Sequence, residues 1–382
     1  MLELPAECLV VSDLGVFRLV RETVHAAAFS GRSGGLGLCL TIDPDDWSFR
    51  AVLTLADERW GQAETFTDGS SFSLAGAVHA VGDWLDSLAT DDYLNDTERD
   101  VRYLDTACGK VAYYAYNVEL AKTPVLFVHG GPGGESSPVR MRTLRLDRPV
   151  YCYDQLGCGR SDRISDLSSW RVENYVAELR TVIEKLGLRE VILSGASWGA
   201  GLITAYIERY GTDGIKACIL PSPFLNSQVW TDDQQMNFKL MPATFQQEMA
   251  RCVREHDTGP AYHALMREYD KRFLFVQPEN APIADAAGDA YSDVFEVLWG
   301  PDENVCTGSL QGFDVEPALT KLEMPVLFVC GDSDEVTLPT MMRYRGMVPG
   351  SQLAVVPGAG HATAKDQPVL YQEILVRFLR DL

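Results

Sequence analysis

The sequence predicts an α/β fold in which a mostly parallel sheet carries a helical insertion, preceded by a small α+β domain. From residue 101 onward, short apolar runs alternate with amphipathic helical patterns, the order that parallel strands with right-handed crossovers produce. Residues 222–316 interrupt this order, because they are mostly helical in character and lack apolar strand runs. Residues 1–98 follow a separate pattern of strands and one helix.

The strongest local pattern is a strand, a sharp turn and a helix within residues 191–211. Val191 to Leu193 form a short apolar run, and Gly195-Ala-Ser-Trp-Gly199 follows as the turn. Glycines suit such a turn, because its backbone is strained and the next helix must pass close to the strand. This nucleophile elbow would hold Ser197 at a helix N-terminus, where amide groups favour a developing negative charge.

The pattern G-x-S-x-G is weak by itself, and the chain contains it a second time at Gly31-Arg-Ser-Gly-Gly35. Here a strand-like run, Leu36 to Leu40, follows the serine in place of a helix. We therefore interpret Ser33 as a loop serine and the glycine cluster as a turn between strands. Leu40 also stands where a dinucleotide-binding fingerprint would need a third glycine.

The bulk composition predicts a soluble globular protein without a nucleic-acid partner. The 382 residues are 46% hydrophobic and 23% charged, and the net charge of −21 would repel phosphates. Nine cysteines without metal-site spacing predict a reduced, cytoplasmic chain. The acidic stretch Met1 to Cys8 is unlike a signal peptide, and no apolar run reaches membrane-spanning length. We expect no metal, no cofactor and no membrane association.

The first 98 residues predict a small α+β domain of several strands followed by a helix. Strand-like runs are Val16 to Val24, Leu36 to Ile42 and Phe49 to Leu55, and Ser73 to Leu88 is helical in spacing. The acidic stretch Asp91 to Asp100 is interpreted as a linker. From its position alone, we hypothesise that this domain mediates self-association into a homo-oligomer or covers the mouth of the lid.

The remaining chain divides into a first core part (99–221), a helical lid (222–316) and a second core part (317–382). A hairpin is expected at Val101 to Leu104 and Val111 to Tyr116. Buried strands are expected at Pro124 to Val128, Val150 to Asp154, Pro325 to Cys330 and Leu353 to Pro357. Helices are expected at Val172 to Leu186, Phe245 to Glu255, Ala261 to Phe275, Ala290 to Leu298 and Val369 to Leu382.

A glycine-rich loop, His129-Gly-Gly-Pro-Gly-Gly134, follows the first buried strand. Glycines let backbone amides approach a ligand oxygen, and the absence of Gly-Lys-Ser/Thr argues against a nucleotide phosphate loop. In acyl transfer, such a loop supplies one oxyanion-hole donor and the amide after the nucleophile supplies the other. We assign these donors to Gly131 and Trp198, and interpret His129 as a structural residue of the loop.

A serine nucleophile needs a base, and the base needs an orienting carboxylate, in the chain order Ser, Asp, His for this architecture. Gly358-Ala-Gly-His-Ala362 follows a predicted strand, so His361 is the predicted base. The acidic loop Gly331-Asp-Ser-Asp-Glu335 follows the preceding strand. Asp334 is the predicted acid, and Asp332 and Glu335 are alternatives.

With these motifs assembled, residues 101–382 resemble the proline iminopeptidase family of α/β-hydrolases. The match rests on the glycine-rich loop, the elbow, the two late loops and Asp154-Gln-Leu-Gly-Cys-Gly-Arg-Ser-Asp162. In the lid, Leu298-Trp-Gly-Pro-Asp-Glu303 resembles the branch that contains tricorn-interacting aminopeptidases and L-amino-acid amidases. The resemblance implies that Glu303 binds the free α-ammonium group of a substrate, where a carboxylate would select N-terminal residues.

Three features depart from the family pattern. Tyr269 to Val276 has neither the family's usual His nor its usual Arg at the expected places, and the acidic loop is one residue longer before Pro339. The second lid carboxylate that the family leads us to expect has only Glu268 or Asp270 as candidates. We also expect Trp299 to line the substrate pocket, although lid aromatics more often form the lid's own core.

The sequence therefore predicts a cytoplasmic serine hydrolase that removes proline or a small apolar residue from the N-terminus of short peptides. Ser197, His361 and Asp334 would act through an acyl-enzyme, with a small peptide or amino-acid amide as partner. The alternatives are an amino-acid amide hydrolase or an esterase of the same mechanism, and a ligand-binding protein that keeps the fold without turnover. Epoxide hydrolase and dehalogenase chemistry is disfavoured, since it needs an aspartate where Ser197 stands.

Overall fold

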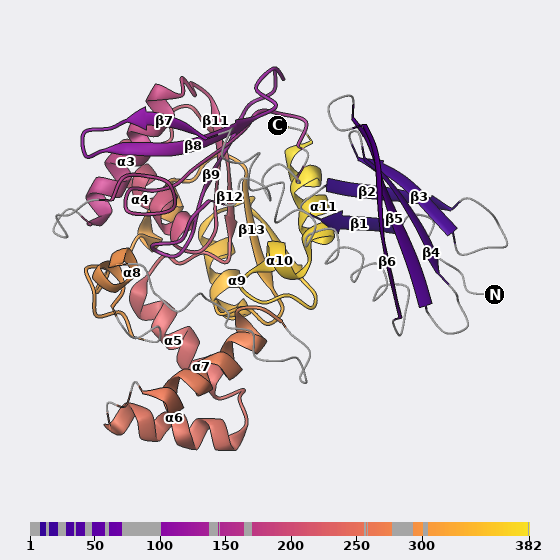
Figure 1. The fold of residues 1–382 in the computed structure, drawn as a ribbon. Coiled ribbons are helices and arrows are strands. Elements are labelled where there is room, and N and C mark those ends of the chain that lie inside the picture. Colours follow the sequence, from indigo (N-terminus) through magenta and orange to yellow (C-terminus); the bar gives the residue numbers. More distant parts are fainter. Residues whose placement is uncertain are drawn as a thin grey trace. The chain divides into compact units, whose positions relative to one another are not determined.

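The computed structural model (Figure 1) describes residues 101–136, 144, 146–163, 170–255, 257, 259–276, 293–300, 305–380 and 382, and the backbone of six strands between residues 8 and 70. The chain divides into two compact units. One unit contains residues 1–100 with 138–145, and the other contains residues 101–137 with 146–382. The predicted domain boundaries stay predictions.

The N-terminal unit contains a sheet of six strands, each antiparallel to its neighbour in sequence. They are β1 (Cys8–Ser12), β2 (Gly15–Arg21), β3 (Ala28–Ser33), β4 (Leu36–Ile42), β5 (Ser48–Asp57) and β6 (Gly61–Ser70). Three of them, β2, β4 and β5, overlap the predicted runs. The others are short or rich in polar residues and glycine, so they lack a clear apolar alternation.

Ser33 corrects one prediction about this unit. It is the last residue of β3 and pairs with Leu36 of β4, so it belongs to a strand and not to a loop. The next described element after it is a strand, in agreement with its exclusion as a nucleophile. The predicted helix Ser73 to Leu88 and the predicted linker Asp91 to Asp100 lie outside the described residues.

The second unit is built on an eight-stranded sheet in the order β14-β13-β12-β11-β9-β10-β8-β7. Its strands are β7 (Arg102–Asp105), β8 (Lys110–Tyr116), β9 (Val125–Val128), β10 (Val150–Tyr153), β11 (Val191–Gly195), β12 (Ile215–Pro221), β13 (Val326–Gly331) and β14 (Gln352–Val356). The hairpin β7–β8 and the pair β8–β10 are antiparallel, and all other neighbours are parallel. Parallel strands bring their carboxyl ends to one edge, and the predicted site loops follow those ends.

Continuous apolar strands at the centre of the sheet reflect burial on both faces. Every residue of β9, β11 and β13 is buried. Helix α4 (Trp198–Tyr210) packs on β9, β11 and β12, and α3 (Val172–Lys185) packs on α4. Helix α9 (Leu338–Met347) packs on β13 and β14, and α11 (Pro368–Leu379) packs on β14 beside the short α10 (Thr363–Asp366).

The structure describes four helices between β12 and β13 in the chain, and Figure 1 shows α5, α6 and α7 grouped below the sheet. They are α5 (Ser227–Phe238), α6 (Ala243–Glu255), α7 (Pro260–Phe273) and α8 (Asp293–Leu298), followed by a 3-10 helix, η2 (Glu316–Lys321). Helices α5 to α7 share a hydrophobic cluster of their own, which includes Phe238, Met249, Tyr269 and Phe273. The insertion therefore has an internal core.

Helix α5 was not among the predicted helices. Asn226 caps it by accepting hydrogen bonds from two backbone N–H groups, but its buried residues include Asp233, Gln234 and Asn237. A buried face made of polar side chains produces no apolar periodicity. The hydrophobic pattern of the sequence therefore gave no signal for this helix. Its polar residues contact the acidic loop after β13.

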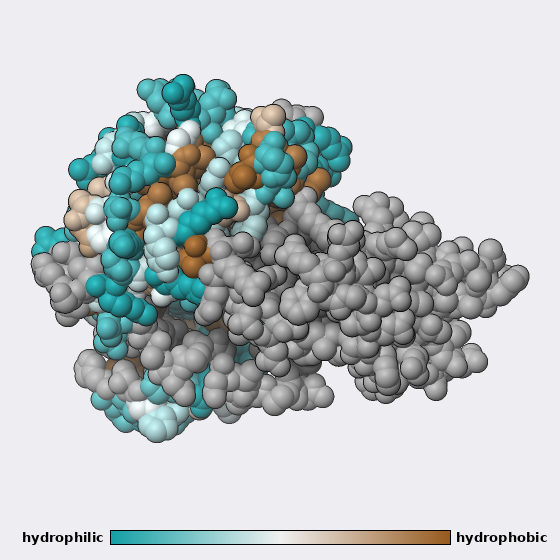
Figure 2. All heavy atoms as spheres, turned by 45° about the horizontal axis from the view of Figure 1, so that its top comes forward, coloured by the Kyte–Doolittle hydropathy of each residue, from teal (hydrophilic) through white to brown (hydrophobic). Residues whose placement is uncertain are grey.

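Hydrophilic residues cover most of the described surface that Figure 2 shows, and apolar residues form only small groups among them. Such scattered groups are normal for a globular protein surface. Among the helices that the structure describes, none is both long and apolar enough to cross a membrane.

The close approach of α4 to β9 makes a first prediction. A Cβ on Gly199 would lie 2.2 Å from the carbonyl oxygen of Val128, so Gly199→Ala should destabilise the fold by about 3 kcal/mol. The matched control is Gly346→Ala in α9, where a Cβ meets nothing within 4 Å. This control should stabilise by about 0.5–1 kcal/mol. Urea unfolding of both variants measures the difference, and equal midpoints would contradict the packing argument.

Candidate active site

Ser197 occupies a strained turn between β11 and α4. Its backbone has φ 54° and ψ −120°, a region that side-chain-bearing residues rarely adopt. A Cβ on Gly195 would lie 2.5 Å from the carbonyl carbon of Gly199, so both flanking positions need glycine. The Ser197 N–H donates to the Pro221 carbonyl at 3.0 Å, which fixes the turn to the end of β12. The serine is half-buried.

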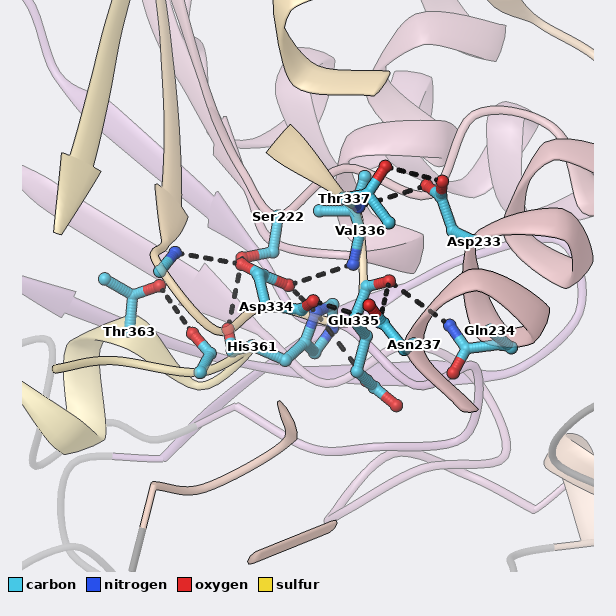
Figure 3. A network of polar contacts seen from close by, with 12 residues as sticks. Ser222, Asp233, Gln234, Asn237, Asp334, Glu335, Val336, Thr337, His361 and Thr363 are labelled. Atoms are coloured by element: carbon cyan, nitrogen blue, oxygen red, sulfur yellow. Dashed lines mark hydrogen bonds and ion pairs between the residues drawn. The ribbon is translucent and has the colours of Figure 1, made fainter. Parts of the chain in front are cut away.

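The predicted acid and base are hydrogen-bonded to each other. His361 Nδ1 lies 2.9 Å from Asp334 Oδ1, and Figure 3 shows both side chains in one polar network. Asp334 Oδ1 also accepts the Val336 N–H at 3.2 Å, and Oδ2 accepts the Gly331 N–H at 3.1 Å. These donors hold the carboxylate in place. A donor at Nδ1 leaves Nε2 of the neutral imidazole free of a proton, as a general base requires.

The other two candidate acids lie in different places. Asp332 is exposed and accepts the Gly358 N–H at 3.0 Å. Glu335 Oε2 lies 3.7 Å from His361 Nδ1, beyond hydrogen-bonding distance. The geometry favours Asp334 as the orienting acid.

A short loop after β12 connects the serine turn to this acid–base pair. Ser222 Oγ donates to Asp334 Oδ2 at 2.5 Å and also lies 3.2 Å from the His361 carbonyl. Two residues on, the Phe224 N–H donates to the Ser197 carbonyl at 3.2 Å. Ser222 itself has φ 44° and is fully buried. The strained loop therefore contacts all three predicted catalytic residues.

The His361 loop is also tied to the helical insertion. The His361 N–H donates to the Phe273 carbonyl at the end of α7 at 2.7 Å, and the Ala362 N–H donates to the Leu274 carbonyl at 3.0 Å. The ring of Trp230, from α5, packs on the imidazole with centroids 5.3 Å apart at 78°. Helices α5 and α7 thus both contact His361, the predicted base.

Two opposing effects act on the His361 imidazole. Burial lowers its pKa, but the carboxylates of Glu335 and Asp334 raise it, and together they outweigh burial. The pKa of His361 is therefore raised above 6.5. A more basic imidazole takes a proton from serine more readily, as long as it is neutral at the working pH.

The two predicted oxyanion donors lie at neighbouring strand ends. Gly131, with φ 117°, follows β9, and Trp198 begins α4 after β11. Among the described residues, none accepts a hydrogen bond from the backbone N–H of either one. Free N–H groups beside a half-buried serine are what oxyanion stabilisation needs.

Gln155 joins the two loops that carry these donors. Its Nε2 donates to the His129 carbonyl at 2.9 Å, and its Oε1 accepts the Trp198 indole N–H at 2.9 Å. The Gln155 N–H donates to His129 Nε2 at 2.9 Å, so the ring's Nδ1–H donates to the Gly130 carbonyl at 2.9 Å. Burial lowers the pKa of His129, which keeps this ring neutral. His129 thus buttresses the loop, the structural role expected for it.

Comparison with known proteins identifies the family of this site. Residues 123–368 match the family model of the alpha/beta hydrolase fold. A proline iminopeptidase of Heyndrickxia coagulans is 33% identical over 285 residues, which cover 73% of this chain and 98% of that protein. One from Lactiplantibacillus plantarum is 31% identical over 267 residues, 68% of this chain and 92% of that protein. The chain belongs to the proline iminopeptidase family of α/β-hydrolases.

Membership of this family confirms the predicted α/β-hydrolase fold and makes the chain a hydrolase of the aminopeptidase type. The crystal structure of a proline iminopeptidase from Mycobacterium smegmatis superimposes with a TM-score of 0.66 at 24% identity, covering 74% of this chain and 98% of that one. At that identity the superposition supports the fold alone. Residues 1–122 lie outside the matched family model.

The predicted substrate-binding residues are only partly described. Glu303 lies outside the described residues. Trp299 is 4% exposed, and its ring packs on Phe224 at 5.3 Å and on Phe295 at 6.5 Å. Glu268, one candidate for a second amine-binding carboxylate, lies largely exposed 3.8 Å from Lys271 on α7. The roles of Glu303 and Trp299 in proline iminopeptidase chemistry stay predictions.

Sequence reasoning missed the polar residues that support the site. Ser222 and Gln155 each bind two separate loops, and Asn237 of α5 donates to the carbonyls of Asp334 and Glu335 at 3.2 and 3.0 Å. Gln155 lies in the motif Asp154 to Asp162 that resembles the family, so the sequence did carry a signal that could have identified it. Ser222 and Asn237 carried no comparable signal. Among the described residues, no group of His, Cys, Asp or Glu has the arrangement of a metal site.

The Gln155 network makes a second prediction. Gln155→Met removes the side-chain bonds to the His129 carbonyl and to the Trp198 indole, so the two donor loops lose this common support, and kcat should fall about 100-fold. Trp198→Phe removes the indole N–H together with part of a fully buried ring system. In a double-mutant cycle, the loss for both changes should be smaller than the product of the two separate losses, because both changes remove the same bond. An unchanged kcat in Gln155→Met would contradict this role.

Proposed function

We propose that this chain is a serine aminopeptidase that releases proline or a small apolar residue from the N-terminus of short peptides. The observation that carries the proposal is the His361–Asp334 hydrogen bond, which the loop of residues 221–224 joins to the strained turn of Ser197. The relatives named proline iminopeptidase support the choice of an N-terminal proline.

In the proposed acylation step, Ser197 Oγ attacks the carbonyl carbon of the first residue while His361 Nε2 takes the hydroxyl proton. Asp334 fixes the imidazole tautomer and stabilises the imidazolium that forms. The carbonyl oxygen becomes an oxyanion that accepts hydrogen bonds from the N–H groups of Gly131 and Trp198. The imidazolium then gives its proton to the leaving amine, and the shortened peptide departs.

Deacylation repeats these steps with water as the nucleophile. His361 takes a proton from water, the hydroxide oxygen attacks the acyl carbon, and the ester bond to Ser197 breaks. The serine oxygen regains its proton from the imidazolium, and the free amino acid leaves. The chemistry needs only these side chains and water, so we propose no metal or cofactor.

We propose that Glu303 pairs with the free ammonium group of the substrate, on the strength of its place in the family's lid motif. Such a pair would exclude internal peptide bonds and acylated termini. Trp299 would contribute to the apolar side of the same pocket. Cytoplasmic location, and a role of residues 1–98 in self-association or in covering the lid, also belong to this proposal.

The second candidate function is hydrolysis of amino-acid amides or esters by the same residues. The lid motif around Glu303, which resembles the amidase branch, favours it over a generic esterase. A leaving group smaller than a peptide would need the same ammonium anchor but no extended binding groove. Substrates that differ only in the leaving group separate these functions.

A panel of aminoacyl-naphthylamides with Pro, Ala, Leu and Phe tests the proposed function. Free-amine substrates should be cleaved, and their N-acetylated forms should not. Ser197→Ala should lose activity on the order of a millionfold, because the nucleophile is gone. Glu303→Gln should raise KM for the free-amine substrates. Equal turnover of acetylated substrates, with no effect of Glu303→Gln, would contradict the amine anchor.

The rate should also depend on pH through His361. The neutral imidazole is the base, so kcat/KM should fall as pH drops through the His361 pKa. Because the pKa of His361 is raised, the midpoint of this acid limb should lie above 6.5. A pH profile of kcat/KM measures it. A midpoint clearly below 6.5 would show that the carboxylates do not outweigh burial.

A further inference from the structure

A cavity lies between helix α3, the turn of the β7–β8 hairpin and the loop that follows β10. Its volume is about 210 Å³, and its lining includes Cys108 of the turn, Leu156 of the loop, and Tyr175, Ala177 and Glu178 of α3. A single buried water needs only roughly 10–15 Å³ of such space, so the cavity has room for a small molecule. Part of the lining, including Cys108, is exposed, and none of the predicted catalytic residues belongs to it.

The walls of this cavity are held by hydrogen bonds within and between the three segments. In the turn, the Thr106 hydroxyl donates to the Gly109 carbonyl at 2.7 Å. Leu156 is held by two side chains of α3, because the Tyr175 hydroxyl donates to its carbonyl at 3.1 Å and the Glu178 carboxyl accepts its N–H at 3.2 Å. The cavity is therefore preformed, and a ligand would not have to order its walls.

Glu178 is the only acidic or basic side chain in the lining, and it is 5% exposed. Among the described residues, the Leu156 N–H is the only donor bonded to it, at 3.3 and 3.2 Å from its two oxygens. A carboxylate has about four acceptor sites, so most of the capacity of this group is unused. No Lys, Arg or His in the described part of the chain pairs with it. A cation from solvent would supply the missing partner.

The other titratable groups around Glu178 carry no positive charge. They are the phenols of Tyr153 and Tyr175, the thiol of Cys158 and, in the lining, the thiol of Cys108. Burial raises the pKa of both phenols above 10 and the pKa of the Cys158 thiol to about 12, so these three groups are neutral near pH 8. Burial also raises the pKa of Glu178 to about 8, and its one hydrogen bond lowers it only in part.

The cavity shares two residues with the support of the predicted oxyanion donors. The ring of Tyr175 packs edge-on against the ring of Trp198, with centroids 6.2 Å apart at 85°. Leu156 directly follows Gln155, whose side chain joins the two donor loops. A molecule in the cavity would therefore contact residues that adjoin this support.

We propose that this cavity is a second ligand site, which takes a primary ammonium group on a short apolar chain, and that Glu178 is the anion that pairs with the ammonium. The chain of the ligand would contact Leu156, Ala177 and the ring of Tyr175. An amino acid is disfavoured, because the lining holds no basic group to meet its carboxylate. The site is separate from the one proposed for peptide substrates, and the inference does not rest on the proposed function.

The test is isothermal titration calorimetry of the full chain with n-butylammonium chloride at pH 8.5. Because the proposed substrate site would also bind an ammonium, every protein in the series carries Glu303→Gln. The amine should bind, and Glu178→Gln should weaken binding about 10-fold or more, since the ion pair is lost while the amide oxygen still accepts the Leu156 N–H. The matched control is Glu173→Gln, an exposed position of α3 outside the lining, which should change the affinity by less than about twofold.

Two further ligands of nearly the same size test the chemistry of the site. 1-Butanol lacks the charge and butyrate carries the opposite charge, so both should bind about 10-fold more weakly than n-butylammonium, or not at all. Binding of 1-butanol as tight as that of the amine would show that the cavity selects apolar chains alone, and it would overturn the proposal.

The affinity for n-butylammonium should also follow the ionisation of Glu178. Below its pKa of about 8, the carboxyl must release a proton before it can pair, so binding should be on the order of 10-fold weaker at pH 6.5 than at pH 8.5. In Glu178→Gln, the residual binding should not change between these pH values. An affinity independent of pH in the protein that keeps Glu178 would contradict the pairing.

Absence of binding, or equal affinity with and without Glu178→Gln, would overturn the proposal. If Glu178→Gln does not fold, Ala177→Leu takes its place, because a larger side chain fills the cavity and leaves the carboxyl in place, and it should abolish binding. Binding to wild type that disappears with Glu303→Gln would belong to the proposed substrate site, and it would also overturn the proposal. Failure of wild type to cleave prolyl substrates would remove the proposed function, and the calorimetric result would stand.

Discussion

The contact between the start of α4 and the ends of β9 and β11 is the constraint on which the rest of the site depends. The backbone of Gly199 lies so close to Val128 that no side chain fits between them. This approach forces the turn that holds Ser197 at φ 54°, and it brings the Gly131 loop beside the N-terminus of α4. Main-chain packing therefore sets the backbone positions of the predicted nucleophile and of the predicted oxyanion donors.

Buried polar side chains then bring the separate loops into register. Gln155 connects the glycine-rich loop to the serine turn. Ser222 connects the Asp334 loop to the His361 loop, and its neighbours Pro221 and Phe224 are bonded to Ser197. Asn237 fixes the acidic loop from the helical insertion. Each of these residues satisfies donors or acceptors on two segments, so losing one would leave groups on both segments unpaired. These buried hydrogen bonds therefore align loops that the sheet alone does not hold in place.

Local patterns were sufficient to predict the central strands and the loops after β13 and β14, because apolar runs, glycines and strand ends leave signals within a few residues. Leu126 and Leu193, for example, lie in apolar runs that are fully buried strands. Features that depend on distant segments could not be predicted. Helix α5 was missed because its buried face is polar, and the partner of its Asp233 is Thr337, 104 positions away. No sequence motif marks Ser222, because its hydrogen bond to Asp334 forms only where the folded sheet places the end of β12 beside the end of β13. The choice of Asp334 over Asp332 and Glu335 as the orienting acid likewise needed the distances to His361.

The hydrogen bonds between α7 and the His361 loop have a mechanical consequence. Helices α5 to α7 of the insertion share a hydrophobic cluster of their own. The last turn of α7 is bonded to the backbone of His361, because the Phe273 carbonyl accepts the His361 N–H. The same turn packs against Gly360 with no room for a side chain. Any displacement of α7 would therefore displace the backbone of His361 as well, so the alignment of the proposed base is coupled to the position of the insertion.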